Sequence, residues 1–265
     1  MGQTGGMAGA SGEALTDDRL AEIRRWIGDA QSIVVLTGAG ISTDSGIPDF
    51  RGPQGVWTKN PKAEKTSNIS YYMSDPEVRR LAWMSRLDSR AWTAEPNEGH
   101  RALVVLQRRR KLRMIVTQNV DGLHQAAGIH EDRVVEIHGT MRDVVCMDCA
   151  YRDPIQVALD RVRAGEADPD CPHCGGILKS ATISFGQNLV HEDLVRAEVA
   201  AQNCDLMLAV GSTLAVWPAA GVVPIAKRHG ARVVIINAEP TEMDGLADAV
   251  VNASISEVLP MLVRG

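Results

Sequence analysis

An apolar run that breaks directly into glycines constrains the fold of this chain most. Ile33–Thr37 is apolar or β-branched at every position, and Gly38, Ala39 and Gly40 follow at once. Glycine has no Cβ, so a chain can turn sharply after a strand and bring backbone N–H groups against a pyrophosphate. The pattern predicts a strand followed by a nucleotide-binding turn, with Thr43 at the third position of the dinucleotide fingerprint.

Composition limits the number of domains and the class of ligand. The chain has 265 residues, of which 45% are hydrophobic and 23% are charged, enough for one large core with or without a small module. Its net charge of −5 opposes a surface built to bind nucleic acid stably. The basic cluster at 108–113 is typical of a solvated helix end.

Two segments bear on membranes and targeting. Residues 206–226 carry no charge, but glycines and prolines interrupt them, so we expect a buried strand at 206–210, a turn and a core helix. Residues 1–15 are rich in Gly, Ala and Ser and lack the features of a signal peptide. They are predicted to form a disordered tail of a cytoplasmic protein that has no membrane partner.

Four of the five cysteines form two CxxC pairs, Cys146 with Cys149 and Cys171 with Cys174. This spacing is typical of a tetrahedral zinc site, and four thiolates leave no open position, so the zinc is expected to be structural. A redox CxxC pair is the alternative, and His173 could compete as a ligand.

Polar residues follow two further predicted strands. Residues 112–117 run into Gln118, Asn119 and Asp121, and residues 134–137 run into His138. Because open α/β sheets keep their ligand crevice at the carboxyl ends of their strands, these side chains are candidates for a shared site. Each of them alone is more often a turn or structural residue.

Together these motifs resemble the sirtuin family, of bacterial type. The resemblance covers roughly residues 17–263 and rests on motifs in the family's order, namely 38–42, 46–51, 117–121, His138-Gly139, the two CxxC pairs, Phe185-Gly186, 211–214, 216–218 and 237–239. It implies an NAD-dependent protein lysine deacetylase that transfers the acyl group to ADP-ribose and releases nicotinamide. Its cofactors would be NAD and zinc, and its partners acylated-lysine proteins.

Sequence periodicity agrees with that fold. Strands are expected at 33–37, 112–117, 134–137, 206–210 and 232–236, and helices at 17–29, capped by Thr16, and at 96–110. This alternation predicts an α/β fold with a Rossmann-like, doubly wound parallel sheet. The family adds a helical insert at about 53–93 and a zinc-ribbon module at about 140–180. The NAD-binding domain would then comprise 16–52, 94–139 and 181–265.

The resemblance also implies residue roles. His138 is the expected general base, and Asn119 and Asp121 are the other catalytic candidates. Cofactor contacts are implied for Gly38, Ala39, Gly40, Asp49, Phe50, Arg51, Gln118, Asn119, Asp121, Gly211, Ser212, Asn237, Glu239 and Ile255. Substrate contacts are implied for Met84, Leu87, Phe185, Gly186, Val216 and Trp217.

The acyl group should be apolar. Sirtuins that prefer succinyl-lysine carry a Tyr-x-x-Arg pair, and the matching positions here are Met84 and Leu87, which cannot bind a carboxylate. Arg86 and Arg90 are expected to point to water. Gln187 stands where the family commonly has an acidic residue. We therefore expect activity to depend only weakly on basic residues that flank the substrate lysine.

Two other functions stay open from the sequence. One is transfer of ADP-ribose to a protein, which uses the same activated ribose. The other is a non-catalytic zinc scaffold that binds NAD, although it would not need His138 beside Asn119 and Asp121.

Overall fold

The computed structural model of the chain describes residues 17–49, 55–59 and 63–264. The predicted tail at 1–15, the predicted cap Thr16, and the candidate cofactor residues Phe50 and Arg51 lie outside this part of the chain.

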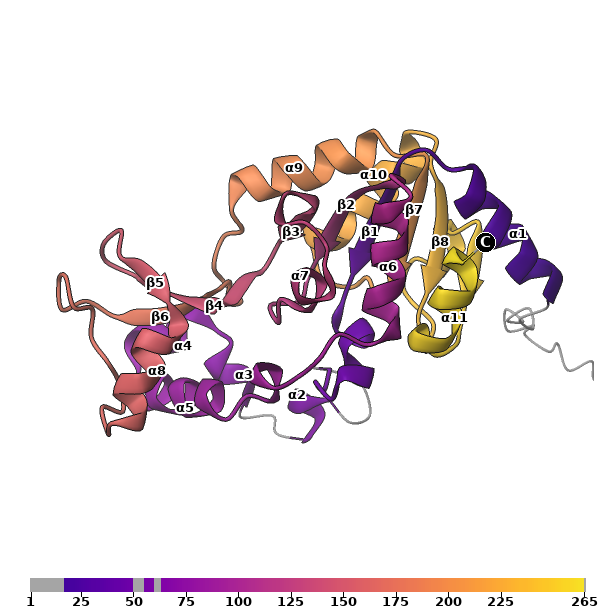
Figure 1. Cartoon of the computed structure of the whole chain (residues 1–265). Coiled ribbons are helices and arrows are strands. Elements are labelled where there is room, and N and C mark those ends of the chain that lie inside the picture. The colour runs from indigo at the N-terminus through magenta and orange to yellow at the C-terminus, as the bar shows by residue number, and fades with distance from the viewer. Residues whose placement is uncertain (1–16, 50–54, 60–62, 265) are drawn as a thin grey trace, which may run out of the picture.

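A parallel six-stranded sheet forms the centre of the larger lobe (Figure 1). Its strands, in spatial order, are β3 (Val134–Glu136), β2 (Leu112–Thr117), β1 (Ile33–Thr37), β7 (Leu206–Val210), β8 (Arg232–Ile236) and β9 (Ala249–Val251). The order runs outward from β1 to β3 on one side and from β7 to β9 on the other. This is the doubly wound arrangement predicted from the sequence, and its switch point lies between β1 and β7.

Helices cover both faces of this sheet. One face packs on α1 (Asp17–Asp29), α6 (Glu98–Arg108) and α11 (Ile255–Val263), and the other on α9 (His191–Gln202) and α10 (Val222–Arg228). Alternate residues of β1 enter the two cores, Val35 on one face and Val34 and Leu36 on the other. Burial on both faces explains why the strand reads as one continuous apolar run.

The smaller lobe joins a helical segment to an antiparallel sheet (Figure 1). The helices are α2 (Val56–Lys59), α3 (Ala63–Thr66), α4 (Ile69–Ser74) and α5 (Pro76–Leu87), and the sheet has the order β5 (Arg152–Pro154), β4 (Gly139–Cys146) and β6 (Leu178–Thr182). Trp83 of α5 packs in one core with Val144 of β4 and with Leu159 of α8 (Ile155–Arg163). The two inserts therefore share a hydrophobic core.

Local caps set the ends of α6, which is shorter than the predicted 96–110. The Asn97 side chain accepts from the backbone N–H groups of Gly99 and His100, so the helix begins at Glu98. Arg110 has a left-handed φ of 59°, which a helix cannot contain. The remaining elements are the short helix α7 (Leu123–Ala127) and the 3₁₀ turns η1 (Ala39–Ser45), η2 (Arg90–Trp92), η3 (Glu131–Arg133), η4 (Ala219–Gly221) and η5 (Asp244–Leu246).

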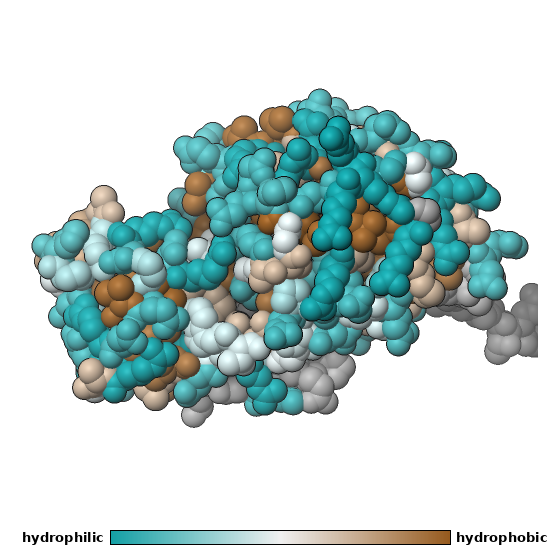
Figure 2. Space-filling view, in the orientation of Figure 1, coloured by the Kyte–Doolittle hydropathy of each residue, from teal (hydrophilic) through white to brown (hydrophobic). Residues whose placement is uncertain are grey.

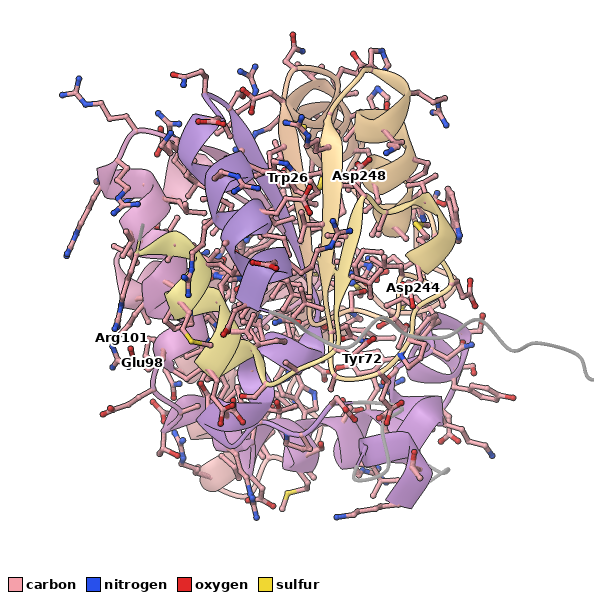
Figure 3. All side chains as sticks on the ribbon, turned by 90° about the vertical axis from the view of Figure 1, so that its right-hand side faces the viewer. Trp26, Tyr72, Glu98, Arg101, Asp244 and Asp248 are labelled. Atoms are coloured by element: carbon pink, nitrogen blue, oxygen red, sulfur yellow. The ribbon has the colours of Figure 1, made fainter. Side chains whose placement is uncertain are left out.

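Polar contacts tie the first helix to the sheet edge. The Arg232 guanidinium carbon lies 5.2 Å from the centre of the Trp26 ring of α1. Arg19, also on α1, donates to the backbone carbonyl of Asp248; Trp26 and Asp248 are labelled in Figure 3. The face in Figure 2 is mostly hydrophilic, and its hydrophobic residues lie in separate patches. Within the described residues, no helix combines the length and the apolar character needed to cross a membrane.

Candidate active site and metal site

Three glycines bring the turns after β1 and β7 into backbone contact at the switch point. A Cβ on Gly38 would lie 2.7 Å from the Gly211 carbonyl oxygen, and one on Gly40 would lie 2.8 Å from the Gly211 Cα. Gly211 itself has a φ of +67°. Side chains at these positions would separate the two turns, which explains the glycines of both motifs. The Gly40 N–H donates to the Gly211 carbonyl at 2.8 Å, whereas within the described residues the Ala39 N–H forms no backbone bond to that turn.

The residues after β2 close over these turns. Gln118 Nε2 donates to Ser212 Oγ at 2.9 Å, which links the ends of β2 and β7. Asn119 is buried, and its Nδ2 donates to the Gly38 carbonyl at 3.0 Å and lies 3.2 Å from Ser42 Oγ. The structure thus brings these predicted cofactor residues together at one edge of the sheet.

Asp121 completes this network through Ser42, a residue that sequence reasoning did not select. Ser42 Oγ donates to Asp121 Oδ2 at 2.8 Å, and the Leu123 N–H donates to Oδ1 at 2.9 Å. Burial raises the pKa of the Asp121 carboxyl, and these two hydrogen bonds oppose the shift. A serine within a polar turn carries no sequence signal of such a contact.

His138 lies at the end of β3 with one ring nitrogen engaged. Its Nδ1 lies 3.1 Å from the Gln118 carbonyl oxygen, which can only accept, so Nδ1 carries the proton and Nε2 keeps its lone pair. Burial lowers the pKa of the imidazole, and the bond to Gln118 partly opposes this. The backbone is fixed as well, because the Ile183 N–H donates to the His138 carbonyl at 2.7 Å. A neutral imidazole of this tautomer can accept a proton.

The other predicted cofactor residues lie after β8, after β9 and after the η1 turn. Asn237 is buried after β8 and donates from Nδ2 to the carbonyl of Glu239, whose side chain is exposed. Ile255 is buried at the start of α11 and belongs to the main core. Asp49 is half-buried and is the last residue described before position 50.

The candidate peptide-binding residues lie on two exposed loops. Phe185 is 44% exposed, and its backbone bonds to Ser67 and Ile69 beside α4. Gly186 follows with a φ of +81°. Val216 is half-buried and Trp217 is 61% exposed. Both rings are more exposed than the core aromatic Trp83.

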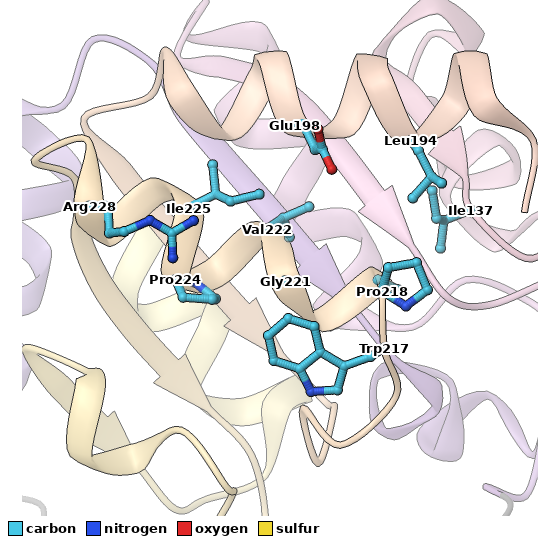
Figure 4. A pocket seen from close by; sticks show the side chains of 11 residues that line it. Ile137, Leu194, Glu198, Trp217, Pro218, Gly221, Val222, Pro224, Ile225 and Arg228 are labelled. Carbon is cyan, nitrogen blue, oxygen red and sulfur yellow. The ribbon is translucent and has the colours of Figure 1, made fainter.

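Trp217 also borders an apolar pocket of about 150 Å³ between α10 and α9 (Figure 4). Glu198 and Arg228 supply the charged groups of its lining.

The orientation of α5 corrects one sequence expectation. Arg86, predicted to point to water, is turned inward and donates from Nη2 to Ser180 Oγ at 3.0 Å. Met84 is instead 48% exposed, and Leu87 packs against the small-lobe core. The reason is helical spacing, because Arg86 follows the core residue Trp83 by three positions and shares its face.

Two buried histidines lie beneath the site and were not predicted. His124 Nε2 contacts Thr37 Oγ1 at 2.9 Å, and its ring centre lies 5.1 Å from that of His100. Burial, and then neighbouring charge, lowers the pKa of His124 to about 3 and that of His100 to about 4. Both rings are therefore neutral at pH 7.

The four predicted zinc ligands converge, with their sulfur atoms all within 4.8 Å of one another. Sγ of Cys146 lies 3.6 Å from Sγ of Cys174, and Sγ of Cys149 lies 3.7 Å from Sγ of Cys171. Sulfurs bound tetrahedrally at about 2.3 Å from zinc lie about 3.8 Å apart, so this cluster fits a closed structural zinc site. The ring of the competing candidate His173 packs on Tyr151 instead.

Curated relatives match over nearly the whole chain. NAD-dependent protein deacetylase 2 of Streptomyces coelicolor is 51% identical over 233 residues, which cover 88% of this chain and 97% of that protein. An NAD-dependent protein deacetylase of Caldivirga maquilingensis is 40% identical, covering 96% of this chain and 95% of that protein.

Solved structures match in fold as well as in sequence. One from work on the mechanism and regulation of Sir2 enzymes is 36% identical with a TM-score of 0.85, covering 94% of this chain and 97% of its own. A Sir2 structure with p53 peptide and NAD⁺ is 31% identical with a TM-score of 0.80, covering 91% of this chain and 95% of its own.

The Sir2 family model matches residues 38–218, which include both glycine motifs, His138 and all four zinc-site cysteines. The chain belongs to the Sir2 family, the sirtuins.

Proposed function

We propose that this chain is an NAD-dependent protein lysine deacetylase. The observation that carries the proposal is the position of His138, which has a free Nε2 and lies next to the hydrogen-bonded set of Gln118, Asn119 and Asp121. Relatives at 51% and 43% identity bear the name NAD-dependent protein deacetylase, which supports the same activity.

NAD is the co-substrate and binds at the switch point of the sheet. The Ala39 amide and Ser212 hold its phosphates, and Gln118 contacts a ribose. Asn237, Glu239 and Ile255 lie on the adenosine side. Support comes from the backbone contact of the glycine turns, since a helix or turn N-terminus without side chains favours close approach of an anion.

Loss of nicotinamide makes the ribose carbon that carried it electrophilic. The amide oxygen of the acyl-lysine is a weak nucleophile, but it can attack this carbon when the site holds the two atoms close together. Asn119 and Asp121 orient the nicotinamide end. His138 then takes a proton from a ribose hydroxyl at Nε2, as general bases with a pKa near or below neutral can do at pH 7. One water molecule is consumed as the lysine amine leaves the acyl carbon, and the products are free lysine, nicotinamide and O-acetyl-ADP-ribose.

The acylated peptide binds as an added strand between the 185–187 loop and residues 214–217. The exposed Phe185 and Trp217 rings support this placement, because one ring lies on each of the two segments and both carry apolar surface. Residues 53–93 and 140–180 form the helical and zinc modules, and 16–52, 94–139 and 181–265 form the NAD-binding domain. Zinc holds its module in shape and takes no part in the chemistry.

The direct test of the carrying observation is His138→Ala. We expect turnover to fall by roughly 10²-fold or more while NAD binding and melting temperature are kept. The matched control is His229→Ala, because that exposed ring also places Nδ1 against a backbone carbonyl, at 2.9 Å. Near-full activity of His138→Ala would remove this residue from the mechanism.

A further inference from the structure

A cavity of about 30 Å³ lies between the helical insert and the small sheet. It is lined from α5 by Trp83 and Arg86, and from β6 by Lys179 and Ser180. Its donors are positively charged or polar, and the strand that lines it leads through Ser184 into the candidate peptide loop.

Arg86 brings an almost unpaired guanidinium to this cavity. Among the described residues its side chain forms one hydrogen bond, from Nη2 to Ser180 Oγ at 3.0 Å, although a guanidinium has five N–H donors. Burial lowers the pKa of Arg86. Arg86 is half-buried, and a charge partly withdrawn from water without a counter-charge is unfavourable, so this arrangement favours an anionic partner.

Lys179 adds a second cation. The residue is 3% exposed, and Nζ donates to the carbonyls of Ser180, at 3.2 Å, and Thr182. Burial and then repulsion from Arg86 lower its pKa to about 8, so the ammonium is still mostly charged at pH 7. The third ammonium hydrogen has no acceptor in the part of the chain that the structure describes.

A third donor is Trp83, which is 2% exposed and whose Nε1 has no partner among the described residues. The neighbouring groups do not supply the missing acceptor. The Tyr72 hydroxyl donates to the Leu178 carbonyl at 2.7 Å. The nearby Asp168 carboxylate, whose charge helps to raise the pKa of Tyr72, is paired with Arg79 at 2.7 Å. Within the described part of the chain, no carboxylate forms an ion pair with Arg86 or Lys179.

We propose that this cavity binds a small monovalent anion of the size of chloride or formate. Its volume of about 30 Å³ exceeds the roughly 10–15 Å³ that a single water molecule needs, so the cavity admits an anion of a few atoms but not a larger organic acid. Charge-assisted hydrogen bonds from Arg86, Lys179 and Trp83 satisfy the anion and relieve the repulsion between the two cations. Because Arg86 is on α5 and Lys179 is on β6, the bound anion links the two inserts.

The test measures the melting temperature of the zinc-loaded wild-type protein in chloride, formate and gluconate at constant ionic strength. Gluconate carries the same charge but is too large for the cavity. We expect a saturable rise of roughly 5 °C or more at an anion concentration 100 times Kd for chloride or formate, and none for gluconate.

Arg86→Met and Lys179→Met should lose this dependence. The matched control is Arg152→Met, which removes an exposed arginine of the same sheet that pairs with Asp143. This control should keep the full dependence. In gluconate, Arg86→Met should melt at or above the wild type, because it lacks the uncompensated cation, and in chloride it should melt below it.

Equal melting of the wild type in all three salts would overturn the proposal, as would an unchanged anion response in Arg86→Met. Chlorine NMR of the wild type gives a readout that needs no variant. Broadening of the chloride line that formate reverses supports the site, and its absence contradicts it. None of these measurements depends on deacetylase activity.

Discussion

The Ser42 hydroxyl donates a 2.8 Å hydrogen bond to the Asp121 carboxylate across 79 positions of sequence. It also lies 3.2 Å from Asn119 Nδ2, so one small side chain holds both polar residues of the β2 turn against the turn after β1. The orientation of the proposed nicotinamide end of the site therefore depends on a residue that need not touch the reacting atoms.

Ser42→Ala should lower kcat/KM for NAD by roughly 10-fold or more, because a buried carboxylate that loses a hydrogen bond costs about 1–3 kcal/mol. Steady-state kinetics with saturating acetylated peptide measure this. Ser256→Ala is the control, since it removes a buried hydroxyl that has no hydrogen-bond partner among the described residues. An unchanged kcat/KM in Ser42→Ala would show that the network does not orient the site.

Stability should fall as pH drops from about 6.5 towards 4. The folded pKa values of His100 and His124 are lowered to about 4 and about 3, so the unfolded chain binds more protons in this range. Urea unfolding at pH 7 and pH 5 should differ by roughly 2 kcal/mol or more. His124→Gln should reduce the difference, whereas His191→Gln, at an exposed site, should not. A pH-independent unfolding free energy would contradict the burial of neutral rings.

Cys171→Ala should abolish stoichiometric zinc binding and cause the protein to unfold or aggregate, because structural zinc contributes about 10 kcal/mol or more to such modules. Metal analysis and thermal melting measure the two effects. Cys204→Ala is the control, since that thiol lies in the core between the large sheet and α9 and bonds to the Ala201 carbonyl. Full activity after complete removal of zinc would overturn the structural role.

Acetyl-lysine should be a far better substrate than succinyl-lysine, and longer apolar acyl chains should be accepted. Met84 and Leu87 cannot bind a carboxylate, and burying one without a partner costs several kcal/mol. The comparison is kcat/KM on one peptide bearing acetyl, butyryl, myristoyl or succinyl groups. A kcat/KM for succinyl-lysine equal to that for acetyl-lysine would contradict this prediction. If Arg86→Met then lost the succinyl activity, Arg86 would be identified as the group that binds the succinyl carboxylate.

Elements that are determined by residues close together in the sequence could be predicted, whereas those that depend on contacts between distant residues could not. The bounds of β1, β2, β7 and β8 were predicted correctly, because strands buried on both faces read as apolar runs that end at glycine or polar residues. The three-residue strand β9 and the elements of the small sheet were not predicted. They are short, and their stability comes from the shared core and the cysteine cluster rather than from periodicity.

The site shows the same division. Motifs identified His138, Asn119, Asp121 and the four cysteines, and the four cysteines do converge. Ser42 was missed because its contact joins two loops, and Arg86 was assigned to the wrong face of its helix. That error arose because the sequence does not show that Trp83 anchors α5 to the zinc module.

The most direct test of the central claim is mass spectrometry of the products formed from NAD and an acetylated peptide. The account predicts equal amounts of deacetylated peptide, nicotinamide and O-acetyl-ADP-ribose, with no product when NAD is omitted. ADP-ribose attached to a protein, with the acetyl group left on the peptide, would instead identify a transferase. No reaction despite NAD binding would identify a scaffold, and either result would contradict the deacetylase assignment.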